Sequence, residues 1–267
     1  MINFLHTFQP QAILFSFGPI TLYWYGLLMV ISILIALAIT FYLARYYQIS
    51  SETIFDLSFW LIINGLIGAR IYDDLLQLPY YLEHPLQSLQ IWKGGLAIHG
   101  AIIAGLITII VFAQRRQLNF WKLSALFVPG LALAQAIGRW GNYFNQEIFG
   151  LPTARSWGIP IDLINRPINY ISEAYFHPTF LYESLGCLLI GGILLIFTFY
   201  SIKKNNLNEK FYVWVLALYM VLYSILRFFL EFIRLDKTPD LFGLRWPQII
   251  SLFIIIWSGL LIFFKYH

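Results

Sequence analysis

Long apolar runs separated by short polar segments dominate the pattern of this chain. A helix that crosses a membrane needs about 20 mostly apolar residues, and seven runs approach or exceed this length. They cover residues 18–44, 54–76, 94–113, 123–139, 178–200, 211–232 and 246–264. The pattern therefore predicts an all-α fold, a polytopic helical bundle with about seven transmembrane helices.

Two stretches outside these runs have a distinct composition. Residues 142–177 are polar and contain Pro152, Pro160 and Pro167 among several aromatic residues. We expect them to form an outer-face loop region between the fourth and fifth spans, either an interfacial lid or a docking surface for a peptide. Residues 1–17 are rich in Phe and Leu but lack a basic N-terminal region, so they predict a segment in the membrane interface and not a cleaved signal peptide.

Composition supports a membrane protein. Hydrophobic residues make up 60% of the 267 residues and charged residues 11%, whereas soluble domains carry about 25% charged residues. We expect one integral membrane domain over residues 1–267. The net charge of +4 is spread over short segments, which argues against nucleic acid as a partner and favours membrane lipids. No spacing typical of a metal site occurs, and we interpret the single cysteine, Cys187, as a packing residue.

Loop charges indicate the orientation. Basic residues divide almost evenly between the two sides, but Arg115-Arg116 and Lys203-Lys204 lie in short loops, as cytoplasmic anchors do. We therefore expect the N-terminus outside and the C-terminus in the cytoplasm. This orientation places the unusual polar residues of the spans in the outer half of the membrane or at its outer surface.

The most informative polar stretch, residues 138–147, follows the fourth apolar run. Ionisable groups near membrane depth cost several kcal/mol unless they are paired or solvated, so they indicate a functional site by default. Arg139 offers a fork of donors that suits a phosphate. Asn142 and Asn145 add neutral donors, and Glu147 can accept a proton or orient the arginine. The alternative is a polar loop that only caps a helix end.

A second polar group lies at the end of the sixth run. Its members are spaced by four, four and three residues, which places them on one face of a helix; they are Tyr223, Arg227, Glu231 and Arg234. One interpretation is that Arg227 and Glu231 only neutralise each other. We favour the other, in which Tyr223 and Arg227 face a polar cavity and Glu231 orients Arg227, because arginine at this depth rarely lacks a ligand or partner.

Histidines and an acid complete the candidates. His99 stands among closely spaced glycines, which let helices approach closely or let a lipid group lie against the helix. Imidazole titrates near pH 6.5, at about the value that suits a general base, but a histidine on an apolar face is also often a core residue. His177 precedes Pro178 at a predicted helix start, and Glu183 inside the fifth span needs a cationic partner.

These motifs together resemble the prolipoprotein diacylglyceryl transferase family. They occur in the family's order and near its spacings: Trp24-Tyr25-Gly26, Gly94-Gly95 with His99-Gly100, the signature over residues 138–150, His177-Pro178-Thr179 with Leu181-Tyr182-Glu183, and Arg227 with Glu231 and Arg234. The resemblance extends from the first span to the last. One departure is Ala101, where members often carry a second glycine, which could alter packing beside His99.

The resemblance implies a bacterial inner-membrane enzyme that begins lipoprotein maturation. It would transfer diacylglyceryl from phosphatidylglycerol to the lipobox cysteine of a preprolipoprotein signal peptide, forming a thioether and releasing glycerol 1-phosphate. His99 would be the base, and Arg139 and Arg227 would clamp the phosphate. The implied substrate-binding residues are Tyr25, Asn142, Asn145, Glu147, Gly150, Tyr223, Glu231 and Arg234. No metal or organic cofactor is expected.

An anion- or proton-coupled transporter is the alternative, since it would also use intramembrane Arg, Glu and His. Such proteins are commonly built from paired repeats, and no second copy of any motif is apparent in the sequence. A purely structural membrane protein would not need so many ionisable groups. Taken without the resemblance, the residues indicate a membrane protein that handles an anionic lipid headgroup.

Overall fold

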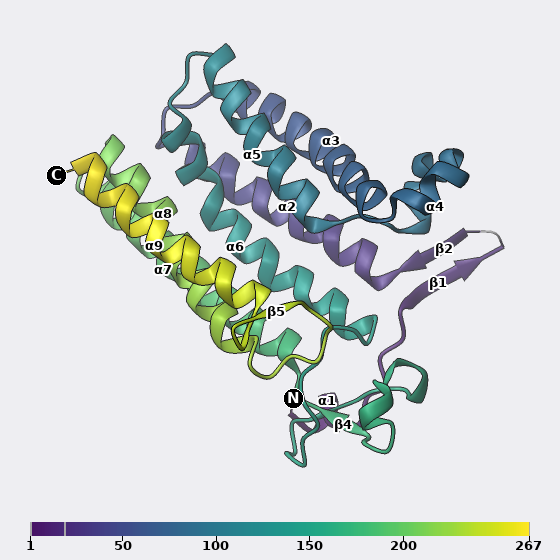
Figure 1. Ribbon diagram of the computed structural model, residues 1–267. Coiled ribbons are helices and arrows are strands. Elements are labelled where there is room, and N and C mark those ends of the chain that lie inside the picture. The colour runs from purple at the N-terminus through teal and green to yellow at the C-terminus, as the bar shows by residue number, and fades with distance from the viewer. Residues whose placement is uncertain (1, 19, 267) are drawn as a thin grey trace. The chain divides into compact units, whose positions relative to one another are not determined.

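The computed structural model describes residues 2–18 and 20–266. In this part of the chain, seven helices are long and apolar enough to cross a membrane. They are α2 (Trp24–Ala44), α3 (Ser51–Leu76), α5 (Ile98–Arg115), α6 (Phe120–Phe144), α7 (Thr179–Lys203), α8 (Glu209–Leu230) and α9 (Trp246–Tyr266) (Figure 1). The predicted all-α class with seven spans is confirmed.

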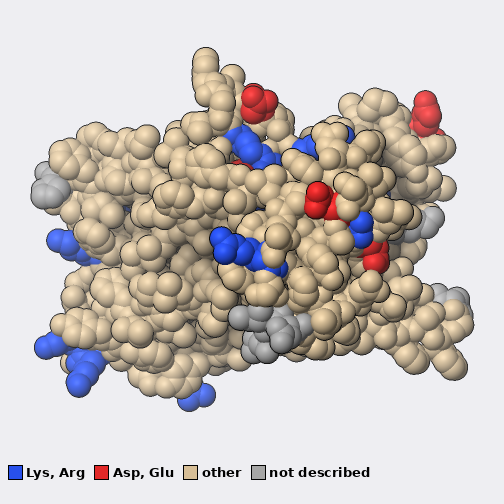
Figure 2. All heavy atoms as spheres, turned by 90° about the horizontal axis from the view of Figure 1, so that it is seen from below, with Lys and Arg blue, Asp and Glu red and all other residues tan. Residues whose placement is uncertain are grey.

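The surface of these helices suits a lipid environment. Large apolar side chains are exposed along the spans, for example Phe253 on α9 and Ile196 on α7. Figure 2 shows that Lys, Arg, Asp and Glu occupy a small part of the face that it displays. Apolar side chains turned outward are stable in hydrocarbon and costly in water, so this surface agrees with a multi-pass membrane protein.

The chain divides into two compact units. Unit 1 comprises residues 1–39 and 127–267, and unit 2 comprises residues 40–126. The prediction of one integral membrane domain over the whole chain stays a prediction.

Unit 2 is built on the close packing of α3 against α5. A Cβ on Gly100 would collide with the carbonyl oxygen of Gly68 and lie 2.5 Å from Cβ of Tyr72, so the two backbones meet where both residues are glycine. The amide of Asn64 also donates a 3.0 Å hydrogen bond to the hydroxyl of Thr108. At least one of the glycines beside His99 therefore serves helix packing.

Short elements connect α3 to α5 in unit 2: α4 (Leu78–Glu83) and the 3-10 helices η1 (Pro85–Leu89) and η2 (Ile91–Lys93). The third predicted span was expected from residue 94, but α5 begins at Ile98. Gly94 and Gly95 have φ values of 92° and 74°, a left-handed conformation that a right-handed helix does not accommodate.

The helices of unit 1 pack through small residues and a few polar contacts. A Cβ on Gly191 of α7 would lie 2.7 Å from Cγ of Leu133 on α6. The hydroxyl of Ser184 donates to the carbonyl of Ala136 at 2.6 Å, and that of Tyr219 donates to Gln135 at 3.0 Å. Cys187 is fully buried, as expected of a packing residue.

Two further span boundaries differ clearly from prediction. The first span was expected from residue 18, but the chain preceding Trp24 forms an antiparallel hairpin of β1 (Ile13–Phe17) and β2 (Ile20–Tyr23), which follows the short helix α1 (Ile2–Thr7). The fourth span was expected to end at Arg139, but α6 continues to Phe144. Arg139 and Asn142 therefore lie on the last turns of a helix and not in a loop.

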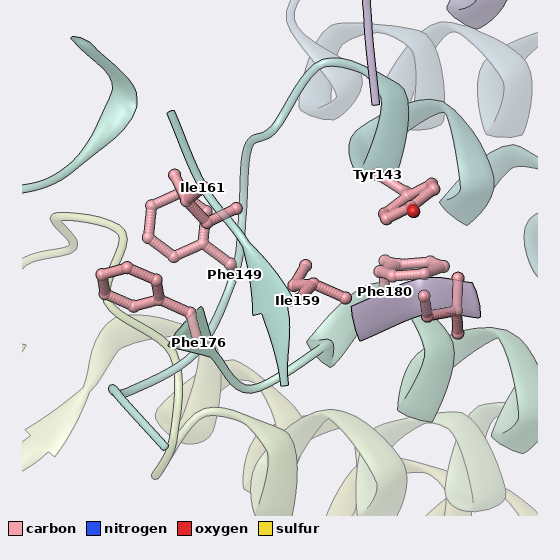
Figure 3. Packing of buried hydrophobic residues seen from close by; sticks show 7 residues of the cluster. Tyr143, Phe149, Ile159, Ile161, Phe176 and Phe180 are labelled. Carbon is pink, nitrogen blue, oxygen red and sulfur yellow. The ribbon is translucent and has the colours of Figure 1, made fainter. Parts of the chain in front are cut away.

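The segment between α6 and α7 folds around a small core that it shares with α1 and with the adjoining ends of α6 and α7. It contains β3 (Ile159–Pro160), η3 (Leu163–Asn165), η4 (Ile168–Tyr170) and β4 (Tyr175–Phe176), and β3 pairs with β4. The buried cluster is formed by Leu5, Tyr143, Phe149, Ile159, Ile161, Phe176 and Phe180 (Figure 3). Because Tyr143 belongs to α6 and Phe180 to α7, this core fixes the ends of both helices.

Candidate active site

Glu183 is the centre of a polar cluster in unit 1. It lies in the second turn of α7, and its side chain is 2% exposed. Its carboxylate is 2.7 Å from Nη2 of Arg139 and 3.4 Å from Nη1 of Arg227. Arg234 approaches to 3.8 Å, and the hydroxyl of Tyr223 donates a 3.0 Å hydrogen bond to the same carboxylate. One buried acid thus holds arginines from α6, α8 and the segment after α8.

Glu231 is a second buried acid at the same cluster. Its side chain is 0% exposed and lies 3.0 Å from Nη2 of Arg227, one turn earlier in the sequence. Arg245 reaches the other carboxylate oxygen at 3.2 Å, and Arg234 lies 3.8 Å away. The expected pairing of Glu231 with Arg227 is present, but Glu231 also ties in two further arginines.

Arg245 and Asp236 fix the turn between α8 and α9. Arg245 precedes α9 in the short strand β6 (Leu244–Arg245), which pairs with β5 (Asp240–Leu241). Its guanidinium donates to the carbonyls of Glu231 and Arg234 at 2.9 and 2.8 Å and also to that of Asp236. Burial favours a raised pKa for Asp236, but its hydrogen bond to Arg234 and the charges of Arg234 and Arg245 hold the pKa below its usual value. Asp236 is therefore ionised at neutral pH.

The cluster carries a surplus of positive charge. Its ion pairs join four guanidinium groups (Arg139, Arg227, Arg234 and Arg245) to three carboxylates (Glu183, Glu231 and Asp236). The side chains of Arg139, Arg245 and Arg227 are 23%, 20% and 16% exposed, whereas both glutamates are almost completely covered. Asp236 is 30% exposed, so the accessible side of the cluster presents three guanidinium groups and one carboxylate, and its net positive charge suits an anion such as a phosphate.

Residues that follow Arg139 in the sequence form a chain of hydrogen bonds that begins at its side chain. Asn142 accepts a 3.4 Å hydrogen bond from Nη1 of Arg139 and donates a 2.8 Å hydrogen bond to Glu147. Asn145 donates to the same oxygen of Glu147 at 3.4 Å. Gln146, with a φ of 52°, turns the chain back so that Glu147 faces the end of α6. Glu147 thus acts on Arg139 through Asn142 and not by direct contact.

Tyr25 and Gly150 lie at two edges of this arrangement. A Cβ on Gly141 would come within 2.5 Å of the ring of Tyr25, so the tyrosine packs tightly against the turn of α6 that carries Asn142. The amide of Gly150 donates to the carbonyl of His177 at 2.9 Å, and Gly150 forms an antiparallel bridge with Arg234. A Cβ on Gly150 would lie 2.9 Å from the carbonyl oxygen of Ile233. Glycine is therefore needed for this close approach.

The remaining candidate, His99, belongs to unit 2. It is the second residue of α5, and its ring centroid is 5.8 Å from that of Tyr72. The buried arginine of this unit, Arg70, donates to the carbonyls of Ser88, Gly94 and Gly95 at 2.9 Å and of Gln87 at 2.5 Å. Arg70 therefore ties the connection between α3 and α5 to α3, close to the start of the helix that carries His99.

Comparison with known proteins establishes the family. The family model described as prolipoprotein diacylglyceryl transferase matches residues 12–264. The chain belongs to this family. A phosphatidylglycerol–prolipoprotein diacylglyceryl transferase of Nostoc sp. is 42% identical over 94% of this chain and 87% of its own length. The protein of the same name from Synechocystis sp. is 40% identical over 95% of this chain and 89% of its own length.

Membership of the prolipoprotein diacylglyceryl transferase family confirms the resemblance inferred from the sequence, and it makes the chain a transferase. Its seven apolar helices and bacterial relatives identify a multi-pass protein of the bacterial inner membrane. Nothing in the comparisons favours a transporter. Among the described residues, no group of three or more His, Cys, Asp and Glu side chains could hold a metal ion.

The sequence interpretation left three members of the cluster out of the site. Glu183 had a clear signal, an acid one turn inside an apolar span, and it was noted only as needing a cationic partner. Arg245 also had one, since it directly precedes a span. Asp236 had none, because an acid in a polar turn is ordinary and only the fold shows its contact with Arg234.

Proposed function

We propose that the arginine cluster of unit 1 binds the phosphate of phosphatidylglycerol while the diacylglyceryl group is transferred to a prolipoprotein. Diacylglyceryl transfer from this lipid is the activity that the family and the names of its members give for the chain. This location rests on the surplus of guanidinium groups at the accessible side of a cluster whose two glutamates are buried.

The reaction explains why such a cluster is useful. The thiolate of the lipobox cysteine attacks the glyceryl carbon that bears the phosphate, so a carbon–sulfur bond forms and the carbon–oxygen bond breaks. The products are a thioether and glycerol 1-phosphate, and the phosphate gains one negative charge as it leaves. Guanidinium groups fixed in advance stabilise that developing charge without reorganisation. Arg139 and Arg227 are the groups proposed to do so.

The buried acids position the arginines for this task. Nη2 of Arg139 is 2.7 Å from Glu183, which leaves other donors of its guanidinium for a ligand. Arg227 is held between Glu183 and Glu231 at 3.4 and 3.0 Å. Tyr223, which donates to Glu183, and Arg234 complete this support. The phosphate would thus meet side chains whose rotamers are already fixed.

Residues next to Arg139 would bind the rest of the headgroup. Asn142, Asn145 and Glu147 present amide and carboxylate groups that suit the hydroxyls of the glycerol headgroup. Tyr25 would border the same space from α2, since its ring lies against Gly141. Gly150 would contribute indirectly, by letting the signature segment approach the chain that carries Arg234.

His99 is proposed as the general base that removes the proton from the acceptor thiol. A free cysteine has a pKa of about 8.5, so little thiolate is present at neutral pH without help. The acceptor cysteine belongs to the prolipoprotein, which is why the buried Cys187 has no role in the transfer. The proposed orientation, with the N-terminus outside and the C-terminus in the cytoplasm, would let the signal peptide and the lipid meet at the outer leaflet.

An in vitro transfer assay tests the proposed function. Purified protein in detergent is incubated with phosphatidylglycerol and a lipobox peptide, and glycerol phosphate and lipidated peptide are measured. Both products should appear in equal amounts. A peptide with serine in place of the cysteine, and phosphatidylethanolamine as the donor lipid, serve as controls. Glycerol phosphate release without peptide modification would contradict the proposed transfer, as would the absence of both products from folded protein.

A further inference from the structure

The β1–β2 hairpin carries a row of large apolar side chains on one of its faces. Residues paired across an antiparallel hairpin lie on the same face, and alternate residues of a strand share a face. Phe15 pairs with Leu22, and Phe17 is two residues after Phe15, so these three side chains form one face. The rings of Phe15 and Phe17 stack at 6.5 Å. Ser16 and Thr21 pair on the opposite face, and Ile13 and Tyr23 pair on that face nearer the base of the hairpin.

The apolar face is open. Phe15, Phe17 and Leu22 are 56%, 74% and 53% exposed. An isolated two-stranded hairpin is at best marginally stable in water. Exposing three large apolar side chains on one face to water would destabilise it further. No Lys, Arg, Asp, Glu or His occurs in the sequence between His6 and Arg45. A face of this kind suits a lipid surface better than water or a charged partner.

The chain connectivity places this hairpin at the membrane boundary. β2 ends at Tyr23 and α2, the first span, begins at Trp24 with no residue between them (Figure 1). The base of the hairpin therefore lies where the first span leaves the hydrocarbon. Tyr23, Trp24 and Tyr25 follow one another at this point, and such aromatic residues are enriched at the membrane–water interface.

The base of the hairpin is also fixed to the proposed phosphate site. The ring of Trp24 stacks on that of Phe144 at the end of α6, with centroids 4.5 Å apart. The next residue, Tyr25, packs against Gly141 of the same helix. Arg139 and Asn142 lie on these last turns of α6. The depth of the hairpin in the lipid and the depth of the arginine cluster are thus coupled through two adjacent ring contacts.

We propose that the β1–β2 hairpin is an interfacial arm. Its face of Phe15, Phe17 and Leu22 lies in the leaflet at which α2 begins, at the boundary between headgroups and acyl chains, and Ser16 and Thr21 on its other face meet the headgroups. Through Trp24 and Tyr25 the arm holds the end of α6, and with it Arg139, at the depth of the lipid phosphates. The lipid contact stands independently of the proposed function, whereas the positioning of Arg139 rests on it.

Spin labels measure the lipid contact directly. Phe17→Cys and Ser16→Cys are labelled with a nitroxide in the full-length protein, which is reconstituted in liposomes of phosphatidylethanolamine and phosphatidylglycerol. Asn206→Cys, in the exposed connection between α7 and α8, gives the aqueous reference. Cys187 is fully buried, so mock-labelled wild-type protein measures the background. Phe15→Cys repeats the test on the apolar face if a label at position 17 lowers the melting temperature.

The label at position 17 should collide several-fold more with lipid-soluble oxygen than with a water-soluble nickel complex, relative to the labels at positions 16 and 206. An aqueous profile at position 17, equal to that at position 206, would overturn the lipid contact. Protection from nickel that develops only after a lipobox peptide is added would also overturn it, because the occupant of the face would then be the peptide.

A turnover measurement tests the positioning role. Phe15→Ser/Phe17→Ser protein should lose turnover several-fold with phosphatidylglycerol in liposomes and keep wild-type turnover in detergent micelles, where no bilayer depth exists. The matched control is Ser16→Ala on the opposite face, which should behave as wild type in both. If the double variant has the same turnover relative to wild type in liposomes as in micelles, the positioning role is overturned. The spin-label result is not affected by this outcome.

Discussion

Both units of this chain bury arginine side chains, and they use them differently. In unit 2, the guanidinium of Arg70 donates to four backbone carbonyls between Gln87 and Gly95 and also pairs with Asp74 at 3.2 Å. In unit 1, Arg139, Arg227 and Arg234 meet mainly side-chain acids, and guanidinium groups outnumber those acids. The donors of Arg70 are used to hold the chain, whereas the unit 1 cluster keeps donors for a ligand.

The difference shows what an arginine in an apolar span can mean. Such a residue indicates that a partner exists, because the charge is costly alone. It does not indicate whether that partner is the protein's own backbone or a bound molecule. The type of partner distinguishes the two roles. Backbone carbonyls of a connecting segment indicate an arginine that holds the chain in place, and buried carboxylates that leave a net positive charge indicate an anion site.

The largest effect is expected from the pair Arg227 and Glu231. If Arg227 only neutralised Glu231, removing both would be less harmful than removing Arg227 alone, because the buried carboxylate would no longer lack its closest cation. We expect Arg227→Ala/Glu231→Ala protein to show no detectable turnover, like Arg227→Ala alone, because the phosphate contact is lost in both. Turnover is measured with folded protein in the transfer assay. Recovery of activity in the double variant would make unit 1 resemble unit 2, with a purely structural arginine.

Arg139→Lys should lower turnover by about 10³-fold. Lysine keeps the charge but loses the planar fork that can hold Glu183 and a phosphate oxygen together, and removal of one donor to a developing charge typically costs about 10²–10³ in rate. The measurement is steady-state turnover with phosphatidylglycerol. Near-normal turnover would mean that charge alone suffices and that the geometry around Glu183 is incidental.

His99→Gln should lower turnover by about 10²-fold at neutral pH, within the range usual for general-base catalysis. The defect should shrink as the pH rises towards the pKa of the free thiol, because the thiolate then forms without help. A pH–rate profile of wild type and variant checks this. A pH-independent defect with a lowered melting temperature would show that His99, like Arg70, has a structural role in unit 2.

Arg70→Lys should act on stability and not on the lipid. Lysine cannot reach the four carbonyls that the guanidinium bonds, so the loss should be about 2 kcal/mol, seen as a lower melting temperature. The KM for phosphatidylglycerol should stay at the wild-type value. A raised KM at unchanged melting temperature would place Arg70 in lipid binding and remove the contrast between the two units.

Cys187→Ala should have the smallest effect. Cys187 is fully buried in α7, one turn after Glu183, and the change removes only a sulfur atom from the packing, which we expect to lower the melting temperature slightly. Turnover should match wild type. Lost turnover with retained melting temperature would assign a covalent step to this thiol and contradict direct transfer.

The sequence predicts the spans well and their ends less well. Hydrophobic run length determines a membrane helix almost by itself, so all seven were found. The ends failed where local geometry decided: the hairpin before Trp24 displaced the start of the first span, and Gly94-Gly95 delayed the third. Polar residues made the fourth run look shorter than it is, because Arg139 and Asn142 continue α6 within a polar site.

The sequence predicts three arginines of the candidate site but not the acid at its centre. Arg139, Arg227 and Arg234 stand out because arginine is rare in apolar spans. Glu183 holds all three, yet this role depends on contacts of α7 with both α6 and α8, which no local pattern encodes. The same limit applies to Gln146, whose buried amide joins Pro10 and Asp162 far away in the sequence.

Equilibrium binding of phosphatidylglycerol can locate its phosphate site at the arginine cluster of unit 1. Wild-type, Arg139→Lys and Arg70→Lys proteins are placed in nanodiscs of a neutral lipid and titrated with fluorescent phosphatidylglycerol, with the phosphatidylcholine analogue as control. We expect Arg139→Lys to lose the preference for phosphatidylglycerol and Arg70→Lys to keep it. Wild-type affinity in Arg139→Lys, or equal losses in both variants, would contradict the assignment of the phosphate site to the arginine cluster of unit 1.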